Sequence, residues 1–376
     1  MIFLYFVFVP IGLAIGAYLF FYVRRCFNTL GAPTEQKRIK LICALIALCM
    51  GLFAVNVYIG MVIIGHLAVF VAIFQLINFI IKLIARKKYA DGCSLWKKVY
   101  GLGVLPIICT VAVVIGGIIN LNNVVKTEYT VYTDKEIREE GYRVVFISDV
   151  HFGITLDYGE LVEKCEEISS EAPDVVVLGG DIVDNSTTAE EMQQVFKAFG
   201  AIKSEYGVYF VYGNHDRSMR MVDNGFTDSE LLEAITSNGI KILRDESVNL
   251  TEDLVLVGRE DKSKMRAVSG RKGIDELLSI TDKNDYLLVI DHQPCEYAEN
   301  GKAGTDLLLS GHTHGGNFFP INIVFDLFGI NDGVYGLYEI DKDTDAIVSS
   351  GFAIWGFAAK TGVPAEYVLV NIKPQN

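Results

Sequence analysis

Histidines and carboxylates follow short apolar runs at five places in this chain, and the densest place is LLLSGHTHGG, where His312 and His314 bracket one threonine. The other four segments are VVFISDVHFG with Asp149 and His151, VVVLGGDIVD with Asp181, VYFVYGNHD with Asn214, His215 and Asp216, and LLVIDHQP with His292. Apolar runs of this length predict buried strands, and open α/β sheets hold their ligands at the carboxyl ends of such strands. We therefore expect these side chains to converge on one site.

The donor types in these segments suit divalent metal ions of borderline hardness. Carboxylate, amide and neutral imidazole ligands favour Mn, Fe, Zn or Co, whereas an all-thiolate set would indicate structural zinc. Each motif alone is a common turn, but together they offer more donors than one tetrahedral ion can use. Two ions about 3.5–4 Å apart form a clamp for in-line displacement at phosphorus, so the sequence predicts a dinuclear site for phosphoryl chemistry.

In their order along the chain, the motifs D-x-H, G-D-x-x-D, G-N-H-D, H-x-P and G-H-T-H-G-G resemble those of the calcineurin-like metallophosphoesterases, above all the membrane-attached bacterial subgroup. The resemblance covers roughly residues 142–372. It implies that Asp149, His151 and His314 hold one metal ion, that Asn214, His292 and His312 hold the other, and that Asp181 bridges the two. A hydroxide shared by both ions would then attack the phosphorus.

The same resemblance implies a role for His215, which belongs to the part of its motif that faces the substrate. We expect it to stabilise the developing charge or to protonate the leaving oxygen, with Asp216 orienting its ring. A histidine that only supports the structure is the alternative. The family often has an arginine where this chain offers Lys360, and a glutamine where it has Asn317, so phosphate contacts beyond the metal ions are expected to differ.

The residues before this domain are apolar and basic. Up to Lys126 the chain has 12 Lys and Arg against 2 acidic residues, whereas the remainder has 21 basic and 44 acidic residues. We predict a multi-pass transmembrane region at 1–126, with helices at 1–23, 41–59, 64–84 and 99–119, because about 20 apolar residues cross a bilayer. Basic residues gather in the first and third loops, so the positive-inside rule places both termini and the domain at 127–376 on the outer face of the cell membrane.

The domain from residue 127 onward alternates apolar strands with amphipathic helices at 158–170, 189–203 and 229–238. Apolar strands without alternation indicate sheets that are covered on both faces. Shorter runs at 335–340, 346–350 and 367–372 are expected to form strands of a second sheet. The predicted fold class is therefore α/β, with a two-sheet β-sandwich flanked by helices, preceded by an all-α membrane region of four spans.

These features predict a membrane-anchored metal-dependent phosphohydrolase, with the bond left open between a phosphomonoester, a phosphodiester and a pyrophosphate. A non-catalytic metal-binding module that docks a partner at the membrane is one alternative, and intact His215 and Asp181 argue against it. A transporter with an appended regulatory domain is another, and the lack of charged residues in the middle of the spans argues against it. The acidic domain is unsuited to nucleic acid, whose phosphates require Lys and Arg.

Two apolar stretches, 317–329 and 351–360, flank the predicted site. They either line a pocket for a lipid-linked leaving group beside the bilayer or pack into the core. Cys165 and Cys295 are the only cysteines after residue 126, and we expect them to be buried free thiols. A bridge between them would require an oxidising compartment.

Overall fold

The computed structural model describes residues 2–56, 58–91, 94–217, 225–263 and 270–375 of the 376-residue chain. They fall into two compact units, Met1–Ile119 with Gly356–Thr361 and Asn120–Trp355 with Gly362–Asn376. The boundary expected at residues 126 and 127 lies a few residues past this division.

The first unit is helical and apolar. Its helices are α1 (Ile2–Thr29), α2 (Lys37–Ala54), α3 (Gly60–Asp91), α4 (Ser94–Leu102) and α5 (Val104–Leu121). Within the described residues, three helices are long and apolar enough to cross a membrane, at Phe8–Thr29, Gly60–Ala85 and Val104–Leu121. They correspond to the first, third and fourth expected spans.

The second expected span, 41–59, is not among these candidates. Helix α2 ends at Ala54 and has 18 residues, as α5 does, but its first turn contains the three cations Lys37, Arg38 and Lys40. Its uncharged part, residues 41–54, is therefore shorter than a crossing. Residue 57 of this span and residue 1 of the first lie outside the described residues. The fourth span begins later than expected because Gly103, at φ 67°, ends α4 and separates it from α5. The clear candidates are therefore three rather than four.

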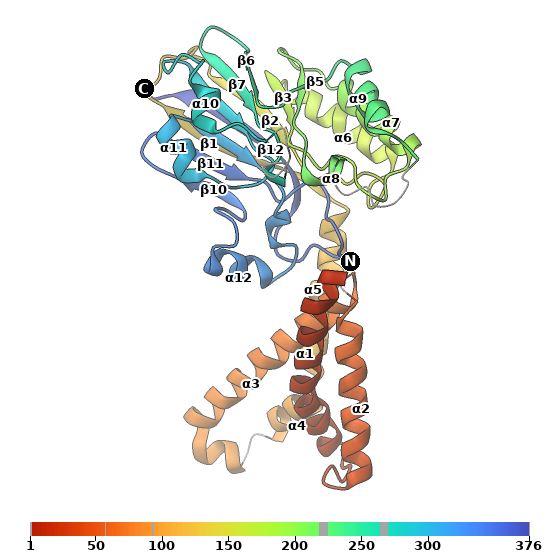
Figure 1. The fold of residues 1–376 in the computed structure, drawn as a ribbon. Coiled ribbons are helices and arrows are strands. Elements are labelled where there is room, and N and C mark those ends of the chain that lie inside the picture. The colour runs from red at the N-terminus through yellow and green to blue at the C-terminus, as the bar shows by residue number, and fades with distance from the viewer. Residues whose placement is uncertain (1, 57, 92–93, 218–224, 264–269, 376) are drawn as a thin grey trace. The chain divides into compact units, whose positions relative to one another are not determined.

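The second unit contains two six-stranded sheets (Figure 1). The first consists, in spatial order, of β1 (Val124–Thr133), β12 (Ala365–Pro374), β2 (Tyr142–Ile147), β3 (Val175–Leu178), β4 (Val208–Phe210) and β5 (Lys241–Ile242). The second consists of β10 (Gly336–Glu339), β11 (Asp345–Val348), β9 (Leu307–Ser310), β8 (Tyr286–Ile290), β7 (Leu254–Gly258) and β6 (Glu246–Asn249). Both sheets are mixed, but the strands that lead to the predicted site, β2 to β4 and β8 to β9, run parallel within each sheet.

Alternate side chains of the central strands face two different layers. Val144 and Phe146 of β2 pack between the sheets, whereas Val145 and Ile147 pack against helices on the outer face. Those helices are α6 (Tyr158–Ser170), α7 (Ala189–Gly200) and α9 (Asp228–Ser237), while α10 (Ile274–Leu278) and α11 (Tyr297–Ala303) cover the second sheet. Two short helices, α8 (Asn214–Arg217) and α12 (Ile321–Phe328), lie in connections that follow β4 and β9. The predicted α/β class, with two sheets between helices, is confirmed.

Local signals account for where the helices on the first sheet begin. Each starts with a capping box, formed by Asp157 with Glu160, Thr188 with Glu191 and Thr227 with Glu230. In this arrangement the first side chain accepts a backbone N–H of the first turn and the glutamate accepts one in return. The expected helices at 158–170, 189–203 and 229–238 are found close to these bounds.

The strand expected at 367–372 was assigned to the wrong sheet. β12 lies in the first sheet, between β1 and β2, and pairs with β1 along its whole length, from Val124 opposite Ala365 to Thr133 opposite Pro374. The strands expected at 335–340 and 346–350 are β10 and β11, and both lie in the second sheet as predicted.

Candidate metal centre

The predicted ligands lie in loops that follow parallel strands of both sheets. In the first sheet β2 leads to Asp149 and His151, β3 to Asp181 and β4 to Asn214, and in the second β8 leads to His292 and β9 to His312 and His314. The loops are joined across the two sheets, because the backbone N–H of His312 donates to both carboxylate oxygens of Asp149, at 3.1 and 2.9 Å. The site is therefore built at the carboxyl ends of strands from two sheets.

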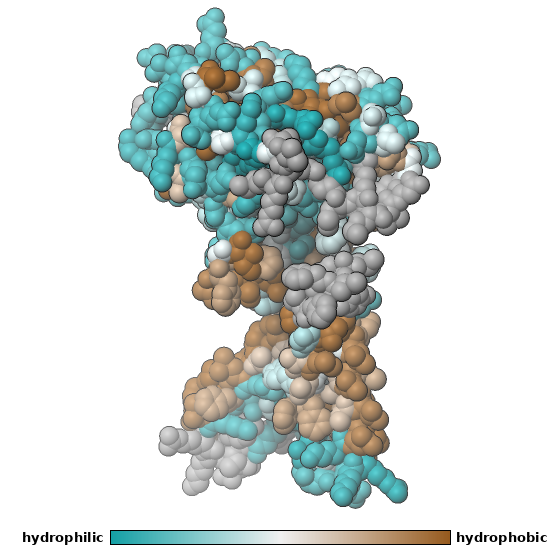
Figure 2. Space-filling view, viewed as in Figure 1, coloured by the Kyte–Doolittle hydropathy of each residue, from teal (hydrophilic) through white to brown (hydrophobic). Residues whose placement is uncertain are grey.

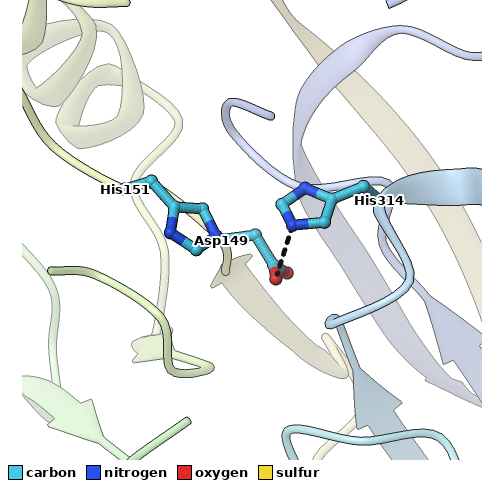
Figure 3. Close-up of side chains that lie close together, drawn as sticks. All are labelled: Asp149, His151 and His314. Carbon is cyan, nitrogen blue, oxygen red and sulfur yellow. Dashed lines mark ion pairs between the residues drawn. The ribbon is translucent and has the colours of Figure 1, made fainter. Parts of the chain in front are cut away.

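Asp149, His151 and His314 form one cluster, in which one ligand atom of each residue lies within 4.8 Å of the others. Figure 3 shows the imidazole of His314 directed at the carboxylate of Asp149, with the ring of His151 beside them. Nε2 of His314 lies 3.6 Å from Oδ1 of Asp149, and the ring centroids of the two histidines are 5.2 Å apart. All three side chains are buried, so these polar atoms face one another rather than water.

Asp181, His292 and His312 form a second cluster by the same criterion. Nδ1 of His292 lies 2.8 Å from the carbonyl oxygen of Gly179 and must donate to it, because a carbonyl only accepts. The lone pair of a neutral ring is then on Nε2, which lies 3.1 Å from Oδ2 of Asp181. Neighbouring donors around an ion with ligand distances near 2.1 Å are about 3.0–3.4 Å apart, so this pair has the spacing of two ligands of one cation.

The loops hold most of these ligands in an unusual backbone conformation. Five of the six cluster residues have positive φ angles, namely Asp149 (55°), His151 (42°), Asp181 (54°), His312 (69°) and His314 (49°). Residues other than glycine rarely adopt this region, and those that do concentrate at functional sites, where the surrounding structure maintains them.

Several buried nitrogen and oxygen atoms that could bind a metal ion lack hydrogen-bond partners within the described part of the chain. They include Nε2 of His151, Nε2 of His292 and Oδ1 of Asn214. A buried polar atom without a partner is unfavourable by roughly 1–3 kcal/mol, and a bound cation would satisfy it. The residues therefore fit divalent metal ions, although coordination by Asn214 and bridging by Asp181 stay predictions.

The charges at the site also fit a cation. Burial alone would raise the pKa of Asp149, but the imidazoles of His314 and His292 outweigh burial and hold that pKa below its usual range. In the same way, the protonated form of His292 holds the pKa of Asp181 well below its usual range against the effect of burial. Burial would lower the pKa of His292, but Asp181 outweighs it and raises that pKa, so a metal ion at this cluster would replace the proton of His292. Both carboxylates are therefore negatively charged at neutral pH, inside a buried site that favours a positive partner.

His215 lies beside the first cluster. Its ring centroid is 5.2 Å from that of His151 and 5.0 Å from that of Trp355, which is half-buried. Burial lowers the pKa of His215, so its imidazole is neutral near pH 7. Trp355 was not identified from the sequence as a residue of the site, because it follows the predicted site motifs in an apolar run that equally indicates core.

Asp216 has backbone contacts that the sequence did not predict. Its carboxylate accepts backbone N–H groups from Asp181, Ile182, Val183 and Gly213, at 2.7–3.2 Å. These bonds connect α8 to the loop that carries Asp181. Asp216 therefore holds the loop backbone in place, and orientation of the ring of His215 by Asp216 stays a prediction.

Asp184 is a buried carboxylate beside the first cluster that was not singled out from the sequence. It is the second aspartate of the G-D-x-x-D motif, and its Oδ2 lies 3.3 Å from Nδ1 of His151. The motif itself was the available signal, because it places a second aspartate three residues after Asp181 in the same loop. A carboxylate behind a ligating histidine fixes the orientation of its ring.

Lys360, the apolar stretch at 351–360 and the two cysteines after residue 126 are all placed by the structure. Lys360 is fully buried and belongs to the first unit, where its backbone N–H donates to Gly117. Phe352 to Ile354 are fully buried in the second unit, which is the core packing given as one alternative for this stretch. Cys165 and Cys295 are buried free thiols, as predicted.

Comparisons with known proteins match the same part of the chain. Residues 142–316 match the family model described as Calcineurin-like phosphoesterase. A Campylobacter jejuni protein described as an uncharacterized metallophosphoesterase is 26% identical over 258 residues, which cover 68% of this chain and 66% of the relative. A Danio rerio protein described as a transmembrane protein with metallophosphoesterase domain is 27% identical over 334 residues, which cover 86% of this chain and 72% of the relative.

The alignments span about two thirds of the length of the bacterial relatives, 66% for Campylobacter jejuni and 64% for Helicobacter pylori. Among solved structures, a dimetal phosphatase from Danio rerio aligns with 56% of this chain and 87% of its own, at a TM-score of 0.36 and 14% identity. That likeness is too low to indicate a shared activity.

Proposed function

The chain carries a calcineurin-like phosphoesterase domain at residues 142–316, and we propose that it is a membrane-anchored phosphohydrolase that works with two divalent metal ions. The observation that supports this most is the presence of two buried Asp/His clusters, each of which combines residues from both sheets. Proposed substrates are phosphomonoesters, phosphodiesters or pyrophosphates, since the same clamp serves all three.

Bound at the two clusters, divalent ions would polarise the phosphate and supply a nucleophile at neutral pH. The mixture of carboxylate, imidazole and amide donors suits Mn, Fe, Zn or Co. The chain prepares the site for them by fixing the rings: Asp184 holds Nδ1 of His151, and the carbonyl of Gly179 holds Nδ1 of His292. In both rings Nε2 is thereby left to face its cluster.

We assign the handling of the leaving group to His215. Its ring is next to the first cluster, and its neutral imidazole carries one N–H that can donate to a phosphate oxygen or to the leaving oxygen. Asp216 acts through other groups, because the four N–H groups that it accepts fix the backbone around Asp181 and Gly213. Asp216 is therefore a positioning residue.

The domain is proposed to face away from the cytoplasm. This requires four crossings, with α2 as the second, because the basic residues gather in the first and third loops. Three crossings would instead put the amino terminus and the domain on opposite sides. Protease protection of tags placed at the two termini in intact cells distinguishes these topologies.

Hydrolysis by the purified full chain tests the proposed activity. In detergent with Mn, we expect turnover of p-nitrophenyl phosphate or of bis(p-nitrophenyl) phosphate, loss of turnover on chelation and its return with Mn. Asp181→Asn should abolish turnover and keep the fold, because asparagine also tolerates a φ of 54°. Asp134→Asn, at an exposed aspartate, is the matched control. Undiminished turnover by Asp181→Asn would show that the activity does not depend on the second cluster. The absence of turnover with any ester and metal would refute the hydrolase and favour the non-catalytic metal-binding module.

A further inference from the structure

Helix α12 exposes an apolar face. None of its eight residues is buried, and the exposed Ile323, Val324, Leu327 and Phe328 follow the i, i+1, i+4, i+5 pattern of one side of a helix. Figure 2 shows this helix as a brown patch beside the teal surface of the same unit. Ile330, just beyond the helix, is also exposed, and the other large exposed apolar side chains in the described part of that unit lie on separate elements. An exposed apolar patch of this kind indicates an interaction surface.

Contacts within the second unit place α12 near the point where the chain leaves its last candidate span. Nδ2 of Asn120, in the last turn of α5, donates to the carbonyl oxygen of Val363 at 2.6 Å. The neighbouring Gly362 lies against the start of α12, since a Cβ on it would be 3.8 Å from Nδ2 of Asn322. The last turn of a spanning helix marks the surface of the bilayer. The start of α12 is therefore connected through Gly362 and Val363 to the last turn of α5.

The metal centre adjoins the same contacts. A Cβ on Gly315, which follows His314 directly, would lie 2.4 Å from Cγ2 of Val363. A Cβ on Gly316 would lie 2.4 Å from Cα of Asn322. The loop that carries His314 therefore packs against both the start of α12 and the residue that Asn120 binds.

A bilayer suits this face better than a folded partner does. The spanning helices keep a bilayer within reach at all times, which raises its effective concentration for any apolar face on the same chain. Leucine and phenylalanine are the residues with which interfacial helices enter the headgroup region. The helix has one charged residue, Asp326, and no Lys or Arg, so its binding would come from apolar contact rather than from attraction to anionic lipids.

We propose that α12 lies in the headgroup region of the bilayer, with Leu327 and Phe328 inserted, and that it presents the metal centre to phosphates at the membrane surface. The substrate is then an amphiphile, a phosphate ester whose apolar tail stays in the bilayer. This substrate class rests on the proposed hydrolase function, whereas the insertion of α12 does not.

Insertion is tested with the full chain in phosphatidylcholine vesicles. Leu327→Cys and Ile280→Cys, at side chains that are 77% and 79% exposed, are labelled with an environment-sensitive fluorophore, and the signal of the chain without an added cysteine is subtracted. We expect the probe at 327 to shift to shorter wavelength and to be quenched by nitroxide lipids, with no change in high salt. The probe at 280 should remain in water. The proposed insertion would be overturned if the probe at 327 kept the emission wavelength of a fluorophore in water. Disulfide cross-linking of two copies through Leu327→Cys would also overturn it.

The substrate class is tested by a ratio of rates. Leu327→Glu should lower the hydrolysis of a long-chain phosphate ester in vesicles, relative to a short soluble ester, by about tenfold. Ile280→Glu should leave this ratio unchanged. An unchanged ratio in Leu327→Glu would refute the amphiphilic substrate and leave the hydrolase intact. An inserted probe at 327 in a chain that hydrolyses no ester would support the insertion and refute the hydrolase.

Discussion

Nδ1 of His151 lies 3.3 Å from Oδ2 of Asp184, and both side chains are almost fully buried. The carboxylate of Asp184 is itself held, because the backbone N–H and the hydroxyl of Ser186 donate to its other oxygen at 2.7 and 2.6 Å. Burial would raise the pKa of Asp184, but His151 and Ser186 outweigh it and lower the pKa to about 2. Asp184 is therefore charged at neutral pH and orients the ring of His151 toward its cluster.

Asp184→Asn is expected to weaken metal binding about 10- to 100-fold, because the ring of His151 loses the charged group that orients it. The affinity can be measured by competition between the protein and a fluorescent chelator for Mn at pH 7. Asp134→Asn, which changes an exposed aspartate, should leave the affinity unchanged. An unaltered affinity in Asp184→Asn would mean that Asp184 only supports the fold.

Asp216→Asn should destabilise the metal-free protein by roughly 3 kcal/mol. Each oxygen of the carboxylate accepts two backbone N–H groups, and the amide nitrogen of asparagine cannot accept the two that are given to the oxygen it replaces, so two buried donors would be left unpaired. The change should appear as a lower denaturation midpoint in urea, again with Asp134→Asn as the control. If the midpoints coincide, the four bonds contribute little and the assignment of Asp216 as a positioning residue fails.

Metal ions should stabilise the folded protein, because they satisfy buried donors such as Nε2 of His151 and Nε2 of His292. At a concentration 100 times the dissociation constant, one bound ion adds about 2.7 kcal/mol. Thermal unfolding with Mn, and then with an excess of chelator, measures the gain. His292→Ala should reduce it by removing a donor from the second cluster. An equal gain in this variant would place the bound ions elsewhere.

The sequence predicted where helices and strands lie along the chain better than it predicted which strands pair with one another. The starts of α6, α7 and α9 could be located because the capping residues Asp157, Thr188 and Thr227 act within one turn. The sheet to which β12 belongs could not be located. Its partners β1 and β2 lie far away along the chain, and an apolar run of this kind carries no information about which strand it will pair with.

At the site, strand ends indicated which Asp and His side chains the fold brings together, because parallel strands bring their carboxyl ends to one edge. The contacts of Asp184 and Asp216 could not be predicted in the same way. Each depends on which ring or backbone amide lies opposite the carboxylate after folding, and the G-D-x-x-D and G-N-H-D motifs do not specify that. Trp355 was missed for a similar reason, since only tertiary packing brings its ring to 5.0 Å from that of His215.

Cys165 and Cys295 should resist thiol reagents while the chain is folded. Burial raises the pKa of Cys165 to about 12, with a further contribution from Glu166. Burial also raises the pKa of Cys295 to about 12, with a further contribution from Asp291. Because the thiolate is the reactive form, both should stay unlabelled by iodoacetamide at pH 8 and react once the chain is unfolded in urea. Mass spectrometry of the peptides resolves each position. Labelling of either cysteine in the folded protein, or a disulfide between them, would contradict the structure.

The same shifts predict how stability depends on alkaline pH. The pKa of each thiol is about 12 in the folded protein and 9.0 without burial, so the unfolded chain loses its proton first. The stabilisation is fully present below pH 9 and is lost as the pH rises from 9 toward 12. Cys165→Ala removes one titrating group, so the fall in its denaturation midpoint between pH 8 and pH 11 should be shallower than that of the unaltered chain. Parallel curves for the two proteins would show that Cys165 does not titrate as its burial requires.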